Sequence, residues 1–152
     1  MALKLFKLIC ILMVLLLQYS CKQPQTSLHG FNKNSWDFRD SVVFYFDIID
    51  TSETKSVSFF LRNTLDYPYR NLFLLLETQH KSDVAKKDTV QYLISNKYGQ
   101  WLGRGMGKMR DNYFILNENM LFRDSGNYKM IVRHGMRENP LAGINTLGFK
   151  IE

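Results

Sequence analysis

Apolar and polar residues alternate with a period of two along most of the chain from Trp36 onward. Five segments carry the pattern: 42–49, 56–62, 89–95, 127–133 and 146–151. Successive side chains of a β-strand point to opposite faces of its sheet, so this alternation predicts antiparallel strands that bury one face. In the first segment the buried set includes Phe44 and Phe46, while Tyr45 belongs to the opposite face.

A further segment, residues 72–76, is apolar on both faces. Because it is only five residues long and Pro68 precedes it, we expect a central strand rather than a helix. Clusters of Asp, Asn, Ser, Gly and Pro separate the predicted strands and are typical of turns. About seven to eight short strands joined by turns predict an all-β fold, a single antiparallel β-sandwich domain over residues 36–152.

The amino terminus has the organisation of a secretory signal peptide. Lys4 and Lys7 form a short basic start, and an uninterrupted run of ten apolar residues, 8–17, follows. A membrane-spanning helix needs about 20 apolar residues to cross the hydrocarbon core of a bilayer. This run is about half that length, so we expect residues 1–20 to be a cleaved signal peptide.

The residues after the apolar run resemble a bacterial lipobox, in which a cysteine behind a small residue is lipidated and becomes the new amino terminus. Ser20 and Cys21 carry the resemblance, although the pattern usually has leucine and a small residue where this chain has Gln18 and Tyr19. The alternative is an ordinary thiol beside a conventional cleavage site. However, the only other cysteine, Cys10, lies in the apolar run and leaves Cys21 without a disulfide partner.

We therefore expect residues 21–35 to comprise the lipidated Cys21 and a short polar tether that leads to the folded domain. Several acyl chains on one cysteine hold a protein firmly, because each buried methylene contributes about 0.8 kcal/mol. The expected location is the cell envelope, with a lipid anchor in the outer membrane and the domain facing the periplasm.

The charge balance gives no sign of a nucleic-acid partner. The chain has 20 basic and 14 acidic residues and a net charge of +6. Removal of Lys4 and Lys7 with the signal peptide leaves about +4 on the mature chain. Nucleic-acid binders concentrate basic residues on one face, whereas here they are scattered along the sequence.

No residue pattern predicts catalysis, a metal or a cofactor. The glycine-rich stretch 103–109 lacks the spacing of a phosphate loop, which also needs Ser or Thr where Met109 follows Lys108. No serine stands in a nucleophile motif, and no small-molecule substrate is evident. The histidines lack metal-ligand spacing and are expected to be structural or solvated: His29, His80 and His134. Four aspartates form only a loose cluster and are expected to face solvent: Asp37, Asp40, Asp47 and Asp50.

The loop from Gly99 to Arg110 is the candidate surface for binding a partner. It combines Trp101 with Arg104, and these residue types are enriched at the energetic centres of protein interfaces. The alternative is that Trp101 caps the core of the domain and that Arg104 is merely solvated.

Beyond the lipobox, the chain carries short motifs at residues 66–72, 88–90, 99–105, 134–137 and 141–144. Together these motifs cover nearly the whole chain and resemble those of the GldH gliding-motility lipoproteins of the Bacteroidota. The resemblance implies a non-catalytic lipoprotein of the gliding machinery, linked to type IX secretion and to other envelope proteins. The family has no assigned catalytic residues, so only Cys21 is carried over, as the lipidated position.

The rival hypothesis is a surface glycan-binding lipoprotein of a nutrient-uptake system. It would use aromatic residues as a platform on which sugars stack: Trp36, Phe38, Tyr67, Tyr69 and Trp101. In a sandwich such residues more often belong to the core and its rim. Surface export in this phylum is often marked by acidic residues after the cysteine, and residues 22–25 contain none.

Overall fold

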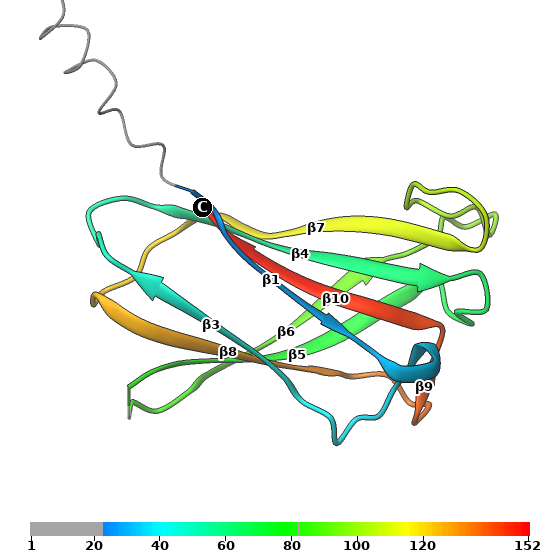
Figure 1. Ribbon diagram of the computed structural model, residues 1–152, viewed down its shortest axis with the longest axis horizontal. Helices are drawn as coiled ribbons and strands as arrows, with labels where there is room; N and C mark the ends of the chain where they lie inside the picture. The colour runs from blue at the N-terminus through cyan, green and yellow to red at the C-terminus, as the bar shows by residue number, and fades with distance from the viewer. Residues whose placement is uncertain (1–22, 82) are drawn as a thin grey trace, which may run out of the picture.

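A computed structural model describes residues 23–81 and 83–152 of the chain, so the predicted signal peptide, residues 1–20, and Cys21 lie outside the described residues. Apart from one short 3-10 helix, the regular secondary structure of the described part is all β (Figure 1). Within it no helix is long and apolar enough to cross a membrane. The elements are β1 (Gln25–Gly30), η1 (Asn32–Asn34), β2 (Ser35–Trp36), β3 (Val42–Ile48), β4 (Lys55–Thr64), β5 (Asn71–His80), β6 (Lys86–Leu93), β7 (Met109–Met120), β8 (Gly126–His134), β9 (Leu141–Ala142) and β10 (Ile144–Ile151).

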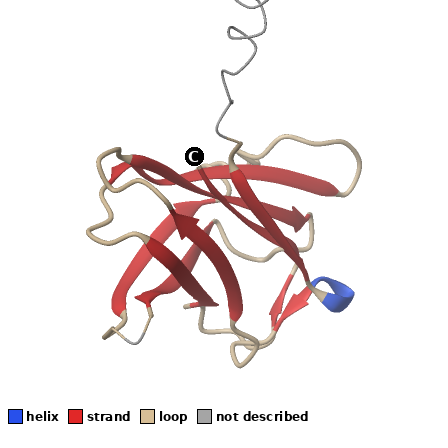
Figure 2. Cartoon of the chain, turned by 60° about the vertical axis from the view of Figure 1, so that its left-hand side comes forward, coloured by secondary structure: helices blue, strands red, loops and turns tan. Residues whose placement is uncertain are grey.

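Eight of the strands form two four-stranded antiparallel sheets. Sheet A has the order β1-β10-β4-β7, and sheet C has the order β3-β8-β5-β6. The two-residue strands β2 and β9 pair separately at one end. Turning the molecule shows the strands in two layers (Figure 2), which confirms the predicted β-sandwich.

The predicted alternation describes the core correctly. The burial pattern of β3 alternates strictly, with Phe44 and Phe46 2% and 3% exposed and Tyr45 72% exposed. Phe149 on β10 lies against both phenylalanines, with ring centroids 5.5 Å and 5.1 Å away, and against Phe59 on β4 at 5.9 Å. The aromatic rings therefore join the two sheets across the middle of the sandwich. The segment 72–76 forms part of β5, an interior strand as expected.

The expected tether over residues 21–35 is too long, because the sandwich begins at Gln25. Strand β1 pairs with β10 along its whole length, from Gln25 opposite Ile151 to Gly30 opposite Thr146. It is an edge strand, and all but one of its side chains are exposed. Backbone hydrogen bonds rather than side-chain burial hold it, so no alternation of apolar residues marked it.

Strand β7 was also missed, for a different reason. Its inward residues Phe114 and Leu116 are half-buried, while its outward residues Tyr113 and Ile115 are exposed. Both faces therefore carry apolar side chains, and the period of two disappears from the sequence. The candidate contact loop is correspondingly shorter than predicted, because β7 already begins at Met109.

Candidate functional site

The candidate contact loop connects β6 to β7 at the right-hand end of the sandwich in Figure 1. Two isolated antiparallel bridges hold its backbone, one between Ser95 and Trp101 and one between Arg104 and Asp111. In the second bridge the Arg104 amide donates to the Asp111 carbonyl at 2.9 Å, and the Asp111 amide donates to the Arg104 carbonyl at 2.6 Å. The loop is therefore a hydrogen-bonded extension of sheet A at the start of β7.

The two candidate side chains lie in different surroundings. Trp101 is half-buried and packs against the hydrophobic core, whereas Arg104 is exposed. Two residues that the sequence did not single out are also exposed here, Tyr98 at 76% and Met106 at 94%. The side chains of Arg104, Tyr98 and Met106 are therefore accessible to a partner. Trp101 instead packs the loop against the core.

Below the loop, a polar cluster links β4 to β7. Arg62 donates two hydrogen bonds of 2.7 Å to the Asp111 carboxylate, one from Nε and one from Nη2. These hydrogen bonds hold the pKa of Asp111 below its usual value. The buried Asn112 amide donates to Asn63 Oδ1 at 2.9 Å. These contacts are satisfied within the fold, so the cluster fixes the start of β7 and leaves no free acid or base.

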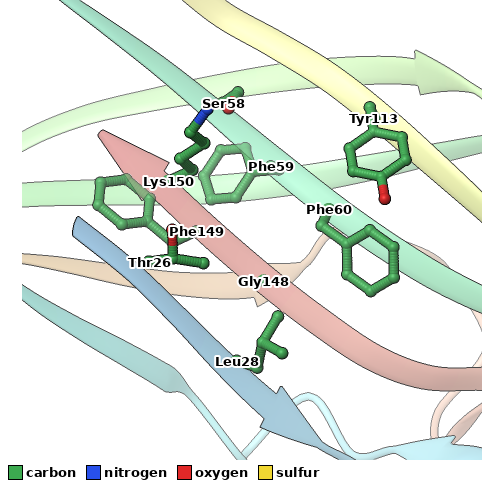
Figure 3. Close-up of a pocket in the computed structure, with 9 residues that line it drawn as sticks. All are labelled: Thr26, Leu28, Ser58, Phe59, Phe60, Tyr113, Gly148, Phe149 and Lys150. Atoms are coloured by element: carbon green, nitrogen blue, oxygen red, sulfur yellow. The ribbon is translucent and has the colours of Figure 1, made fainter. Parts of the chain in front are cut away.

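A shallow apolar hollow of about 230 Å³ lies on the outer face of sheet A (Figure 3). Four residues cross the sheet in register at this level: Leu28 opposite Gly148, Gly148 opposite Phe60, and Phe60 opposite Tyr113. Leu28 is 65% exposed and Tyr113 78%. Gly148 keeps the centre open, since a Cβ there would lie only 2.5 Å from Leu28 Cδ2 and 3.1 Å from Phe60 Cβ.

The outer face of sheet C has a different chemistry. Glu77 on β5 faces Lys87 on β6 at 3.6 Å and Arg133 on β8 at 3.5 Å. Exposed ion pairs of this kind contribute little to stability and keep a surface solvated. The apolar hollow is therefore a feature of sheet A and not of sheet C.

The histidines are dispersed. His29 is exposed on β1, and His80 stacks on Tyr128 with ring centroids 4.4 Å apart. His134 is fully buried beside Trp36, at 5.4 Å between ring centroids, and burial lowers its pKa. Across residues 23–81 and 83–152, no group of three or more His, Cys, Asp or Glu side chains is placed to hold a metal ion.

The members of the two other candidate sets lie in different surroundings. Asp37 forms an ion pair with Arg39 at 2.7 Å, and the hydrogen bonds from Arg39 hold the pKa of this carboxyl well below its usual range. Of the five aromatics considered as a sugar platform, Trp36 and Tyr67 are buried in the core at 0% and 3% exposure. These five residues therefore do not form one exposed platform.

Comparison with known proteins identifies the family. The GldH lipoprotein profile matches residues 24–151. A gliding motility lipoprotein GldH homolog from Christiangramia forsetii is 31% identical over an alignment of 159 positions, gaps included, which covers 97% of this chain and 95% of that protein. The gliding motility lipoprotein GldH of Flavobacterium johnsoniae is 28% identical over 150 residues and 93% of each chain.

Among solved structures, a family GH115 4-O-methyl-α-glucuronidase aligns with 84% of this chain at 11% identity and a TM-score of 0.40. This chain spans only 14% of the length of that enzyme, and a likeness of this degree carries no argument about function. The family profile, in contrast, covers every strand of the sandwich, from Gln25 at the start of β1 to Ile151 at the end of β10. The chain therefore belongs to the GldH lipoprotein family.

Proposed function

We propose that this protein is a non-catalytic component of the gliding motility machinery, linked to type IX secretion. A lipid on Cys21 anchors it in the outer membrane, with the sandwich facing the periplasm. The observation that carries the proposal is the match of nearly the whole chain to relatives named gliding motility lipoproteins. The absence of acidic residues in positions 22–25 supports the periplasmic orientation.

The geometry of the sandwich supports a division between an anchor and a contact surface. Strand β1 starts at the left-hand end in Figure 1, where its first residue lies opposite the end of β10. The candidate contact loop connects β6 to β7 at the other end. A protein anchored before β1 therefore holds Arg104, Tyr98 and Met106 away from its attachment point, where other envelope proteins can reach them.

The anchor is tested by labelling with radioactive palmitate in the native bacterium. The wild-type protein should incorporate label, whereas Cys21→Ala should not and should leave the membrane fraction. Equal labelling of the two proteins would contradict lipidation at Cys21.

The contact loop is tested with Arg104→Ala and Trp101→Ala expressed in place of the wild-type copy. We expect Arg104→Ala to lose envelope partners on co-purification at an unchanged melting temperature, because its side chain is exposed. Trp101→Ala should also melt earlier, because Trp101 packs on the core. The matched control is Arg123→Ala, an exposed arginine between β7 and β8 at the opposite end.

Motility and partner binding should fail together if the protein acts as an assembly component. Colony spreading and adhesin movement should therefore be reduced by Arg104→Ala and preserved by Arg123→Ala. If Arg104→Ala keeps its partners and spreads normally, this loop is not the contact surface. Binding of glycans by the purified domain would favour the nutrient-uptake hypothesis.

A further inference from the structure

Three connections at one end of the sandwich each present an exposed aliphatic side chain. Ile49 follows β3 and is 88% exposed, Val84 precedes β6 and is 97% exposed, and Leu121 follows β7 and is 67% exposed. Isolated surface leucines need no explanation. Here, however, the three side chains stand at the same end of the molecule, on connections from both sheets.

The strand register establishes that these connections share one end. Ile48 at the end of β3 lies opposite Gly126 at the start of β8. On the other side of β8, His80 at the end of β5 lies opposite Tyr128. Val84 and Leu121 also line one groove between their two connections. Figure 1 shows the three connections along its left-hand side, with the β5–β6 connection lowest.

The described chain begins at this same end. Gln25 lies opposite Ile151, and its side chain reaches across to sheet C. Its Nε2 donates to the Asp47 carbonyl at 2.8 Å, and the Asp47 amide donates to its Oε1 at 2.8 Å. These two hydrogen bonds hold the start of β1 beside the end of β3. The chain that leads back to Cys21 therefore departs close to Ile49, which is two residues after Asp47.

The chain length brings this end to the membrane. Cys21 precedes Gln25 by four residues, and four residues of extended chain span at most about 14 Å. Once Cys21 is held in a bilayer by its lipid, contact of the neighbouring connections with the same bilayer is intramolecular. A weak affinity then suffices, because the effective concentration of a surface on so short a linker is high.

We infer that the end of the sandwich formed by Ile49, Val84 and Leu121 docks on the lipid bilayer in which the protein is anchored. The inference rests on the proposed lipid anchor at Cys21. The three aliphatic side chains enter the interfacial region, and the sandwich stands on this end. The contact loop that contains Arg104 then projects away from the membrane.

The charges around these connections indicate that docking depends on apolar insertion rather than on anionic lipids. Basic and acidic residues are equally represented in and beside the three connections: Lys55, Lys81, Lys86 and Arg123; Asp50, Glu53, Asp83 and Asp124. Attraction of a basic surface to anionic lipid is screened by salt, whereas burial of aliphatic groups is not. Docking should therefore occur on zwitterionic vesicles and persist at high salt.

The test places a polarity-sensitive fluorophore at single positions of the lipidated mature protein in phosphatidylcholine vesicles. Cys10 is removed with the signal peptide and the Cys21 sulfur is acylated, so an introduced cysteine would be the only free thiol. The labelled variants are Ile49→Cys and Leu121→Cys at the anchor end. The matched controls are Tyr98→Cys and Met106→Cys, which are similarly exposed positions at the opposite end.

We expect a blue shift for the labels at positions 49 and 121, and loss of their emission when lipids with nitroxide-labelled acyl chains are included. The labels at positions 98 and 106 should keep the emission that they show in water. Equal quenching at the two ends, or none at either, would overturn the docking inference. A requirement for anionic lipid, or release by salt, would overturn apolar insertion as its cause.

A second sample separates this inference from the proposed anchor. The same labelled variants carry Cys21→Ala and an amino-terminal histidine tag that binds nickel-chelating lipid. If the native protein fails to float with vesicles but the tagged protein shows quenching at positions 49 and 121, the lipid anchor is wrong and the docking end is right. If both proteins float with vesicles but neither shows quenching at positions 49 and 121, the lipid anchor is right and the docking end is wrong.

Discussion

Replacement of Phe44 by alanine is the sharpest test of the core. Phe44 is 2% exposed, and its ring stacks on that of Phe149 with centroids 5.5 Å apart and planes 16° apart. This contact joins β3 of sheet C to β10 of sheet A. Removing the ring therefore leaves a cavity between the two sheets rather than at the surface.

The expected loss follows from this position. Truncation of a buried phenylalanine to alanine costs about 3–5 kcal/mol, from lost apolar burial and the cavity left behind. The whole domain is expected to be stable by about 5–15 kcal/mol. In a domain of this size 1 kcal/mol corresponds to roughly 3–5 °C, so Phe44→Ala should lower the melting temperature by about 10–20 °C.

The assay is thermal and urea unfolding of the lipid-free domain, followed by far-ultraviolet circular dichroism. Tyr45→Ala is the matched control, because Tyr45 is the next residue of the same strand and is 72% exposed. It should cost no more than about 0.5 kcal/mol. Phe44→Leu should lie in between, since it retains most of the buried volume. Equal losses for Phe44→Ala and Tyr45→Ala would refute the assigned faces of β3, because a one-residue shift in register exchanges them.

Two further predictions concern the end of the sandwich near β9. Gly143 has φ +83°, and a Cβ there would lie 2.6 Å from the backbone N of Tyr67. Gly143→Ala should therefore lower the urea midpoint of unfolding by an amount equivalent to at least about 1–2 kcal/mol. An unchanged midpoint would contradict the close contact between Gly143 and Tyr67. Burial lowers the pKa of His134 from its usual 6.5, so the unfolded chain takes up a proton first as pH falls. The free energy of unfolding should therefore be highest above pH 6.5 and decline below it, by at most about 1.4 kcal/mol per pH unit. His134→Leu should remove this decline between pH 7 and pH 5.5. An identical pH profile in the variant would show that His134 does not cause the decline.

The sequence by itself determined the fold class and the identity of most inward-facing residues. Alternation in a strand is local information, because neighbouring side chains of an extended backbone must point to opposite faces. The buried set of β3 and the interior position of residues 72–76 followed from this rule. The family resemblance also depended on short motifs in their order along the chain, and the comparisons confirmed it.

Other features depend on pairing between distant segments, and no local pattern revealed them. Strand β1 has few buried side chains, and it joins the sandwich through backbone pairing with β10 and through the hydrogen bonds between Gln25 and Asp47. The hollow on sheet A requires Leu28, Phe60 and Tyr113 to meet around Gly148, four positions on four strands. The sequence does place the apolar Phe60 on the otherwise polar face of its strand. It does not show that Leu28, Gly148 and Tyr113 lie beside Phe60.

The candidate surfaces show the same division. The sequence identified Trp101 and Arg104 by residue type, but only packing placed Trp101 against the core and left Arg104 exposed. It also contained Ile49, Val84 and Leu121 without any sign that they belong together. They share one end of the molecule because antiparallel pairing returns the chain to that end after each pair of strands, and this arrangement is set by the register of the sheets rather than by any local run of residues.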